Sequence, residues 1–190
     1  MPEYIAIIIC ILILAATGGL KGPCEAAGIK QFGVCYTLLC ALALSVFQLR
    51  IGVEVSINLG AAALIFLPGA LMKKDGGSCA GIGAVMLISA VIALLKLSGG
   101  LYGADNGLLC GLMAGASTMI LWKTPASAAC AAGGIPVITA VMDCMFGILF
   151  TGYARVEIGH DTIAAQLIGM CICIGIIWIQ SLASQRASAE

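Results

Sequence analysis

The chain has 190 residues, of which 62% are hydrophobic and only 9% are charged. A soluble domain carries about 25% charged residues, so this composition excludes a water-soluble globular protein and a disordered chain. Nine Lys and Arg balance nine Asp and Glu, which leaves no excess positive charge to attract DNA or RNA, and we expect no nucleic-acid partner. The lipid bilayer is the partner that fits, and the composition predicts a multi-pass protein of the cell membrane.

Seven apolar segments approach the roughly 20 residues that a helix needs to cross the hydrocarbon core. They are apolar on all sides and lack the alternation of membrane β-barrels, so we predict an all-α transmembrane bundle. The bundle forms one domain over residues 1–180, and a short polar tail follows over 181–190. The predicted spans are Tyr4–Leu20, Phe32–Leu49, Val55–Met72, Ser78–Leu95, Gly107–Trp122, Ala126–Phe150 and Thr162–Gln180.

The basic residues indicate the orientation, because cytoplasmic loops of membrane proteins are rich in Lys and Arg. With seven spans, six basic residues fall on the side of the C-terminus and three on the side of the N-terminus. We therefore expect the N-terminus outside and the tail in the cytoplasm. A six-span alternative, with a re-entrant fifth segment, stays open. The six are Lys21, Lys30, Lys73, Lys74, Lys123 and Arg186, and the three are Arg50, Lys96 and Arg155.

Asp143 is the one ionisable residue that lies clearly inside a predicted span. Such residues are costly in lipid and mark functional sites by default, although a buried acid that hydrogen-bonds a neighbouring helix is the alternative. The same segment contains Gly133, Gly134 and Pro136, which predict a broken helix with free backbone groups of the kind that transporters use to bind ions or substrates. A simple kink is the alternative.

Three further polar residues are candidates for the same pathway. Asn58 starts the third segment and Gln166 lies one turn into the seventh, and both amides can link helices by hydrogen bonds. Asp161 opens the seventh segment. Its alternative role is that of a helix cap, which accepts backbone N–H groups and suits the helix dipole.

No pattern in the chain indicates a cofactor, a metal centre or a nucleophilic catalytic set. There is no P-loop and no dinucleotide-binding glycine pattern, and the spacing around His160, with Glu157 and Asp161 nearby, matches no zinc motif. The ten cysteines lie mostly within apolar runs, where a free thiol packs as a small hydrophobic side chain. The sequence therefore favours a non-enzymatic role.

Three stretches resemble a family of uncharacterised prokaryotic multi-pass membrane proteins known only as a domain of unknown function. They are Glu54–Leu71, with an Asn before a Gly/Ala-rich helix, Pro125–Asp143, with small residues before an intramembrane aspartate, and Glu157–Gly169, where Asp161 enters the final helix. The family has Gly-Ala before its first aspartate and an aromatic residue before its second, whereas this chain has Val141-Met142 and His160. The resemblance implies a helical architecture and two notable aspartates, but no reaction.

Gly159-His160-Asp161 also has a weaker similarity to the Gly-x-Gly-Asp motif of intramembrane aspartyl proteases, although the first glycine is missing. Three hypotheses follow. The preferred one is a small permease or binding protein for a solute or ion, with Asp143 beside the broken helix. The second is an intramembrane hydrolase that uses Asp143 and Asp161. The third is a structural subunit that associates with itself or with another membrane protein.

Overall fold

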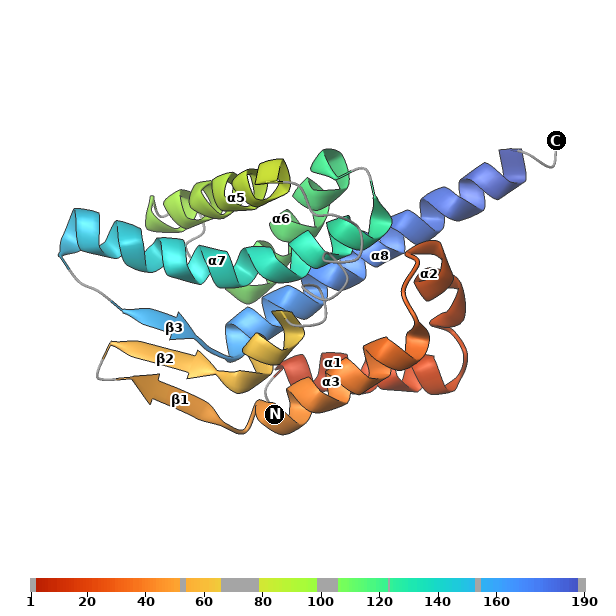
Figure 1. Ribbon diagram of the computed structural model, residues 1–190, viewed down its shortest axis with the longest axis horizontal. Helices are drawn as coiled ribbons and strands as arrows, with labels where there is room; N and C mark the ends of the chain where they lie inside the picture. Colours follow the sequence, from red (N-terminus) through yellow and green to blue (C-terminus); the bar gives the residue numbers. More distant parts are fainter. Residues whose placement is uncertain are drawn as a thin grey trace.

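The computed structural model describes residues 3–51, 54–65, 79–98, 106–122, 124–152 and 155–187. Most of these residues are helical, as the sequence predicts. The N-terminal part consists of α1 (Glu3–Ala16), the short α2 (Lys21–Ala26) and α3 (Gln31–Leu44), and residues 59–65 form one further helical segment. The C-terminal part is a bundle of α5 (Cys79–Leu97), α6 (Asn106–Leu121), α7 (Pro125–Thr151) and α8 (His160–Ala187), which Figure 1 shows in yellow-green to blue.

A three-stranded sheet is an addition to the all-α fold that the sequence predicts. It consists of β1 (Gln48–Ile51), β2 (Val55–Asn58) and β3 (Val156–Ile158) in the order β1-β2-β3. The pair β1–β2 is antiparallel, and β2 pairs with β3 in parallel. The assignment of residues 48–49 and 55–58 to membrane spans is therefore wrong. Alternating β-branched residues in Val55-Ser56-Ile57 favour a strand locally.

Close helix contacts hold the C-terminal bundle together. A Cβ atom at Gly111 would lie 2.8 Å from the carbonyl oxygen of Ala165, and one at Gly115 would lie 2.8 Å from that of Gly169. Glycine is therefore required where α6 crosses α8, because any side chain would force the two backbones apart. α7 contacts both α6 and α8, and α5 packs mainly on α7.

The chain runs back and forth between two ends of the molecule (Figure 1). We call the end that carries β1, β2 and β3 the sheet end, and the end that carries α2 the α2 end. The ring of Tyr4, at the start of α1, stacks on His160, at the start of α8, with centroids 5.1 Å apart. The Tyr4 hydroxyl donates to Ser45 at the end of α3, at 3.1 Å, so α3 returns to the sheet end. At the other end, Gly22 of α2 lies against Trp178, far along α8.

Asn58 joins these elements at the sheet end. Its side chain is 1% exposed, its Nδ2 donates to the Ser45 carbonyl at 2.9 Å, and its Oδ1 accepts from the Gly60 amide at 2.8 Å. The amide thus starts the helical segment 59–65 and fixes it to α3. The prediction that Asn58 links helices is confirmed, and its contacts give it a structural role.

Helix lengths support fewer spans than the sequence predicts. Among the described residues, two helical stretches are long and apolar enough to cross a membrane, Ser127–Phe150 and His160–Ala187. α1 stops at Ala16 and α3 at Leu44, short of the expected ends at Leu20 and Leu49. α8 continues to Ala187, so most of the expected tail is helical. Residues 66–72, Ser78, Lys73, Lys74, Lys123 and 188–190 lie outside the described residues.

Candidate functional site: a polar cavity at the sheet end

The predicted break in the sixth segment is wrong, because α7 is one continuous helix from Pro125 to Thr151 with Pro136 inside it. Proline removes only one backbone donor, the one that would bond the Ala132 carbonyl. This carbonyl lies in the tight crossing with α8, where a Cβ at Gly169 would be 3.2 Å from its oxygen. The lost hydrogen bond is thus buried in a helix contact and exposes no backbone to a pathway.

A cavity of about 270 Å³ lies at the sheet end of the C-terminal bundle. The last turns of α5, the beginnings of α6 and α8, the C-terminal half of α7 and strand β3 all contribute to its wall. Five of the side chains in this wall are charged, two of them basic and three acidic. The lining residues are Lys96, Gly107, Cys110, Pro136, Thr139, Ala140, Asp143, Arg155, Glu157, Asp161, Thr162 and Ala165.

Asp143 forms an ion pair with Lys96 in the cavity wall. Lys96 Nζ lies 2.5 Å from Asp143 Oδ2, and the two side chains are 30% and 28% exposed. The other oxygen, Oδ1, is buried and accepts no hydrogen bond from the described residues. The pair ties the end of α5 to α7. No local pattern in the sequence identifies Lys96 as this partner, because it lies 47 positions before Asp143.

A second, more exposed ion pair lies on the β3 side of the cavity. Arg155 lies 3.1 Å from Glu157, and more than half of each side chain is exposed. Such a surface pair contributes little to stability, typically below about 1 kcal/mol. Its position in the cavity wall nevertheless adds one positive and one negative group to the site. The sequence places Glu157 near His160 and Asp161, but it does not indicate a cavity shared with Asp143, because the position of β3 depends on its pairing with the distant strand β2.

Asp161 lines the same cavity, so the structure brings together three of the predicted site residues, Asp143, Pro136 and Asp161. Asp161 is the second residue of α8 and lies in its first turn, where a carboxylate is favoured by the helix dipole. The first turn starts with the hydrogen bond from Ile163 to the Gly159 carbonyl, so Asp161 lies inside the helix and not at the cap position.

The remaining predicted residues lie outside the cavity wall. Gln166 is fully buried, and its Nε2 donates to the carbonyl of Gly133 at 3.0 Å and to that of Ala61 at 3.4 Å. Its Oε1 is buried and has no hydrogen-bond partner among the described residues. A Cβ atom at Gly134 would meet nothing within 4 Å, so no close contact requires glycine there. Gln166 and Gly133 therefore act together as a link between α8 and α7.

His160 does not belong to a metal centre in the described part of the chain. No group of three His, Cys, Asp or Glu side chains there is close enough to hold an ion. The imidazole stacks on Tyr4 instead, with an angle of 11° between the rings.

Comparisons with known proteins add nothing to the site. No protein-family model matches the chain, and neither a curated protein nor a solved structure matches it. The resemblance noted for Pro125–Asp143 and Glu157–Gly169 thus stays a prediction. The geometry of the cavity is the basis for any functional argument.

Proposed function

We propose that the protein is a multi-pass membrane bundle that binds a small cationic solute or ion in the polar cavity and acts as a permease or binding protein for it. Three acidic side chains and two basic ones line the cavity, which favours a positively charged ligand. The observation that carries the proposal is the Asp143–Lys96 pair, because it places a charged carboxylate well inside α7. Ionisable groups at such positions are typical of ion and substrate pathways.

The membrane location is supported by the apolar side chains on the outside of the bundle. Large exposed patches of this kind are rare on soluble monomers. They occur on helices of both the N-terminal and the C-terminal part, and they include Phe32, Ile120, Leu149 and Phe150, each at least 69% exposed. In a lipid environment these side chains contact hydrocarbon, which removes the free-energy cost of exposing them to water.

The multi-pass part of this proposal is supported by the alternating direction of the described helices. The ends of α5 and α7 meet the starts of α6 and α8 around one cavity, so these four helices alternate in direction. The contacts of Tyr4 with Ser45 and His160 extend the alternation to α1 and α3. The basic residues then predict that the polar cavity opens to the outside. Reporter fusions after Lys74 and after Arg186 should both report the cytoplasm, and opposite sides would contradict the seven-span topology.

The ion pair suggests how binding would work. Lys96 neutralises Asp143 through Oδ2, while Oδ1 is left to accept a further partner. A cation that approaches Oδ1 competes with the Lys96 ammonium for the same carboxylate. Binding and release then exchange one charge partner for another, so Asp143 does not become a buried, unpaired charge at any step.

Flux measurements in proteoliposomes test this proposal. The reconstituted wild-type protein should dissipate a sodium, potassium or proton gradient faster than protein-free liposomes, and Asp143→Asn should abolish this flux. Arg186→Gln removes a charge far from the cavity and should leave the flux unchanged. Wild-type flux in Asp143→Asn, or no cation flux and no cation binding by the wild type, would contradict the proposal.

The hydrolase remains a second candidate because Asp143 and Asp161 line one cavity. The ion pair with Lys96 argues against it, since an aspartyl dyad requires two carboxyl groups that share a proton. Under this alternative, Asp143→Asn and Asp161→Asn would each abolish cleavage of a helical membrane substrate. If neither variant changes flux or cleavage, a structural role in a homo-oligomer or with another membrane subunit is favoured.

A further inference from the structure

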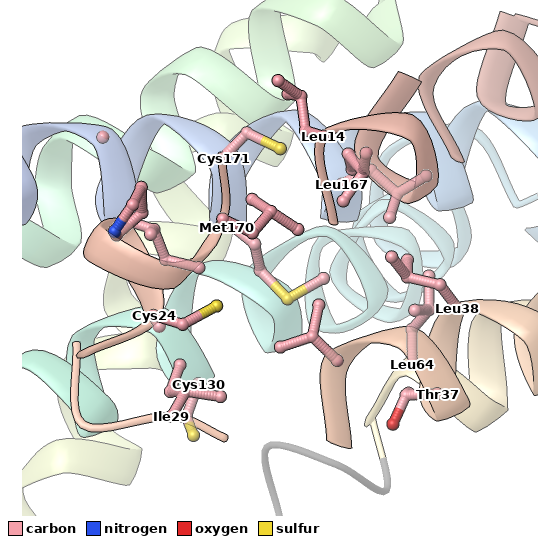
Figure 2. A pocket seen from close by; sticks show the side chains of 17 residues that line it. Leu14, Cys24, Ile29, Thr37, Leu38, Leu64, Cys130, Leu167, Met170 and Cys171 are labelled. Carbon is pink, nitrogen blue, oxygen red and sulfur yellow. The ribbon is translucent and has the colours of Figure 1, made fainter. Parts of the chain in front are cut away.

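A second cavity of about 240 Å³ separates the N-terminal helices from α7 and α8 (Figure 2). Its wall is formed by side chains such as Leu14 of α1, Leu38 of α3, and Leu167 and Met170 of α8. Figure 2 shows the Met170 side chain extending between these helices. The volume is substantial, since an engineered apolar cavity of roughly 150 Å³ already binds benzene.

Water is a poor occupant of this cavity. A buried water needs two to four polar partners. The one hydroxyl in the wall belongs to Thr37, and it donates to the Gly33 carbonyl of its own helix at 2.8 Å. Apart from that group the side chains of the wall are hydrocarbon, with the weakly polar sulfur atoms of Met170 and of three cysteines, Cys24, Cys130 and Cys171. The cavity therefore suits an apolar chain.

Basic side chains flank the cavity at the α2 end. Leu20 and Ile29 line the cavity, and each is followed directly by an exposed lysine, Lys21 and Lys30. Trp178 also lies at the α2 end, because a Cβ atom at Gly22 of α2 would lie 3.0 Å from its indole Nε1. Lysine and tryptophan are enriched where a membrane protein meets the lipid headgroups.

We propose that this cavity binds one acyl chain of an anionic phospholipid, with the lipid phosphate between Lys21 and Lys30. Apolar walls match the chain, and the two lysines match the phosphate. Both lysines lie on the side that the basic residues assign to the cytoplasm, where anionic lipids attract such charges. The inference rests on the membrane location in the proposed function, but not on the polar cavity or on solute transport.

Native mass spectrometry of the full-length protein in mild detergent tests the binding. The protein is incubated with phosphatidylglycerol or with phosphatidylcholine that has the same acyl chains, and the retained lipid is counted. We expect one phosphatidylglycerol to be retained in preference to phosphatidylcholine. Lys21→Gln and Lys30→Gln should each weaken retention about fivefold, from about 1 kcal/mol for a lysine at an anionic surface. Arg186→Gln is the charge-matched control and should retain the lipid.

A cavity-filling variant tests the site of the acyl chain. Gly175 lines the cavity, and a Cβ there meets nothing within 4 Å, so Gly175→Leu should fold and occupy the space. It should lose the bound lipid, while Gly83→Leu should keep it, because Gly83 is exposed on α5 and a Cβ there also meets nothing within 4 Å. Equal retention of the two lipids by the wild type, or undiminished retention by Gly175→Leu, would overturn the inference.

Two controls separate this inference from the proposed function. If alkaline carbonate releases the protein from membranes, the membrane location is wrong and both proposals fail. If the protein stays in the membrane and transports cations without any phosphatidylglycerol preference, only the lipid site is wrong. If the lipid is retained but Asp143→Asn leaves transport intact, only the proposed function is wrong.

Discussion

The two cavities have similar volumes but opposite chemistry, and the same two helices line both. α8 contributes Asp161 and Ala165 to the polar cavity and Leu167 and Met170 to the apolar one. The boundary falls at Gln166, whose buried amide binds the Gly133 carbonyl between the two regions of α7. The comparison indicates that a charged site can be confined to one end of an apolar bundle by one polar link between tightly packed helices.

The largest expected effect concerns the glycine spacing that holds the polar cavity in shape. Gly111→Val places side-chain atoms within 3 Å of the Ala165 carbonyl and of Ile168, so α6 and α8 must separate. We expect a loss of about 3 kcal/mol in the free energy of unfolding, the upper range for overpacking. Thermal unfolding in detergent measures it. Gly175→Ala, in the wall of the apolar cavity, should leave the melting temperature unchanged or raise it. A similar loss of stability in Gly111→Val and Gly175→Ala would contradict the difference that we expect between the two cavities.

The next effect concerns the charge pair of the polar cavity. Lys96→Met leaves the Asp143 carboxylate without its cation and should destabilise the protein by about 2 kcal/mol, less than for a fully buried pair because both side chains are partly exposed. The double variant Lys96→Met/Asp143→Asn should recover most of the stability but not the flux. A double-mutant cycle of melting temperatures checks this coupling, and additive effects would show that the pair contributes nothing.

The two buried amides provide a matched test of the boundary. Asn58 has hydrogen bonds at both ends of its amide, so Asn58→Leu should cost about 1–2 kcal/mol. Gln166→Leu should cost less than about 1 kcal/mol, because the unpaired Oε1 already carries a desolvation cost that leucine removes. Chemical or thermal unfolding ranks the two variants. A larger loss for Gln166→Leu would mean that the link between α7 and α8 depends on more than the two hydrogen bonds of Nε2.

The smallest expected effect is a change in the pH at which the thiol of Cys24, in the wall of the apolar cavity, becomes reactive. Burial raises the pKa of the Cys24 thiol, and the neighbouring Cys35 adds to the shift. The folded protein therefore holds this proton more tightly than the unfolded chain does, so the stabilising contribution is present at neutral pH and is lost as the pH rises. In a variant that keeps only Cys24, the pH midpoint of alkylation should be higher in the folded protein than after denaturation in SDS. Equal pH midpoints in the folded and the denatured protein would contradict a raised pKa of Cys24.

Helices with a simple local pattern could be predicted from the sequence. The expected fifth and sixth segments, Gly107–Trp122 and Ala126–Phe150, match α6 and α7 closely, because apolar composition and length decide them. Asp143 could be singled out for the same reason, as a charge within an apolar run. Its membership of a cavity with Asp161 could not be predicted, since it depends on how α7 and α8 cross.

Features that depend on distant residues were missed. Strand β3 has only three residues and pairs with β2 about 100 positions earlier, so no local pattern identifies it. Lys96 carries no signal as the partner of Asp143, because only the packing of α5 on α7 brings them together. The prediction of a broken helix at Pro136 is wrong because it relies on a local pattern alone. The local rule for proline does not include the helix contact that accommodates the freed carbonyl.

The parallel pairing of β2 with β3 sets an order of events during synthesis of the chain. Val55 pairs with Val156, so β2 must wait until α5, α6 and α7 have left the ribosome before its outer edge is covered. The Gln166–Ala61 contact completes even later, across 105 residues. The N-terminal third thus cannot reach its final form until β3 and α8 have been made, although it is made first. A nascent chain that stops before residue 156 carries an open strand edge available to chaperones or to other unfinished chains.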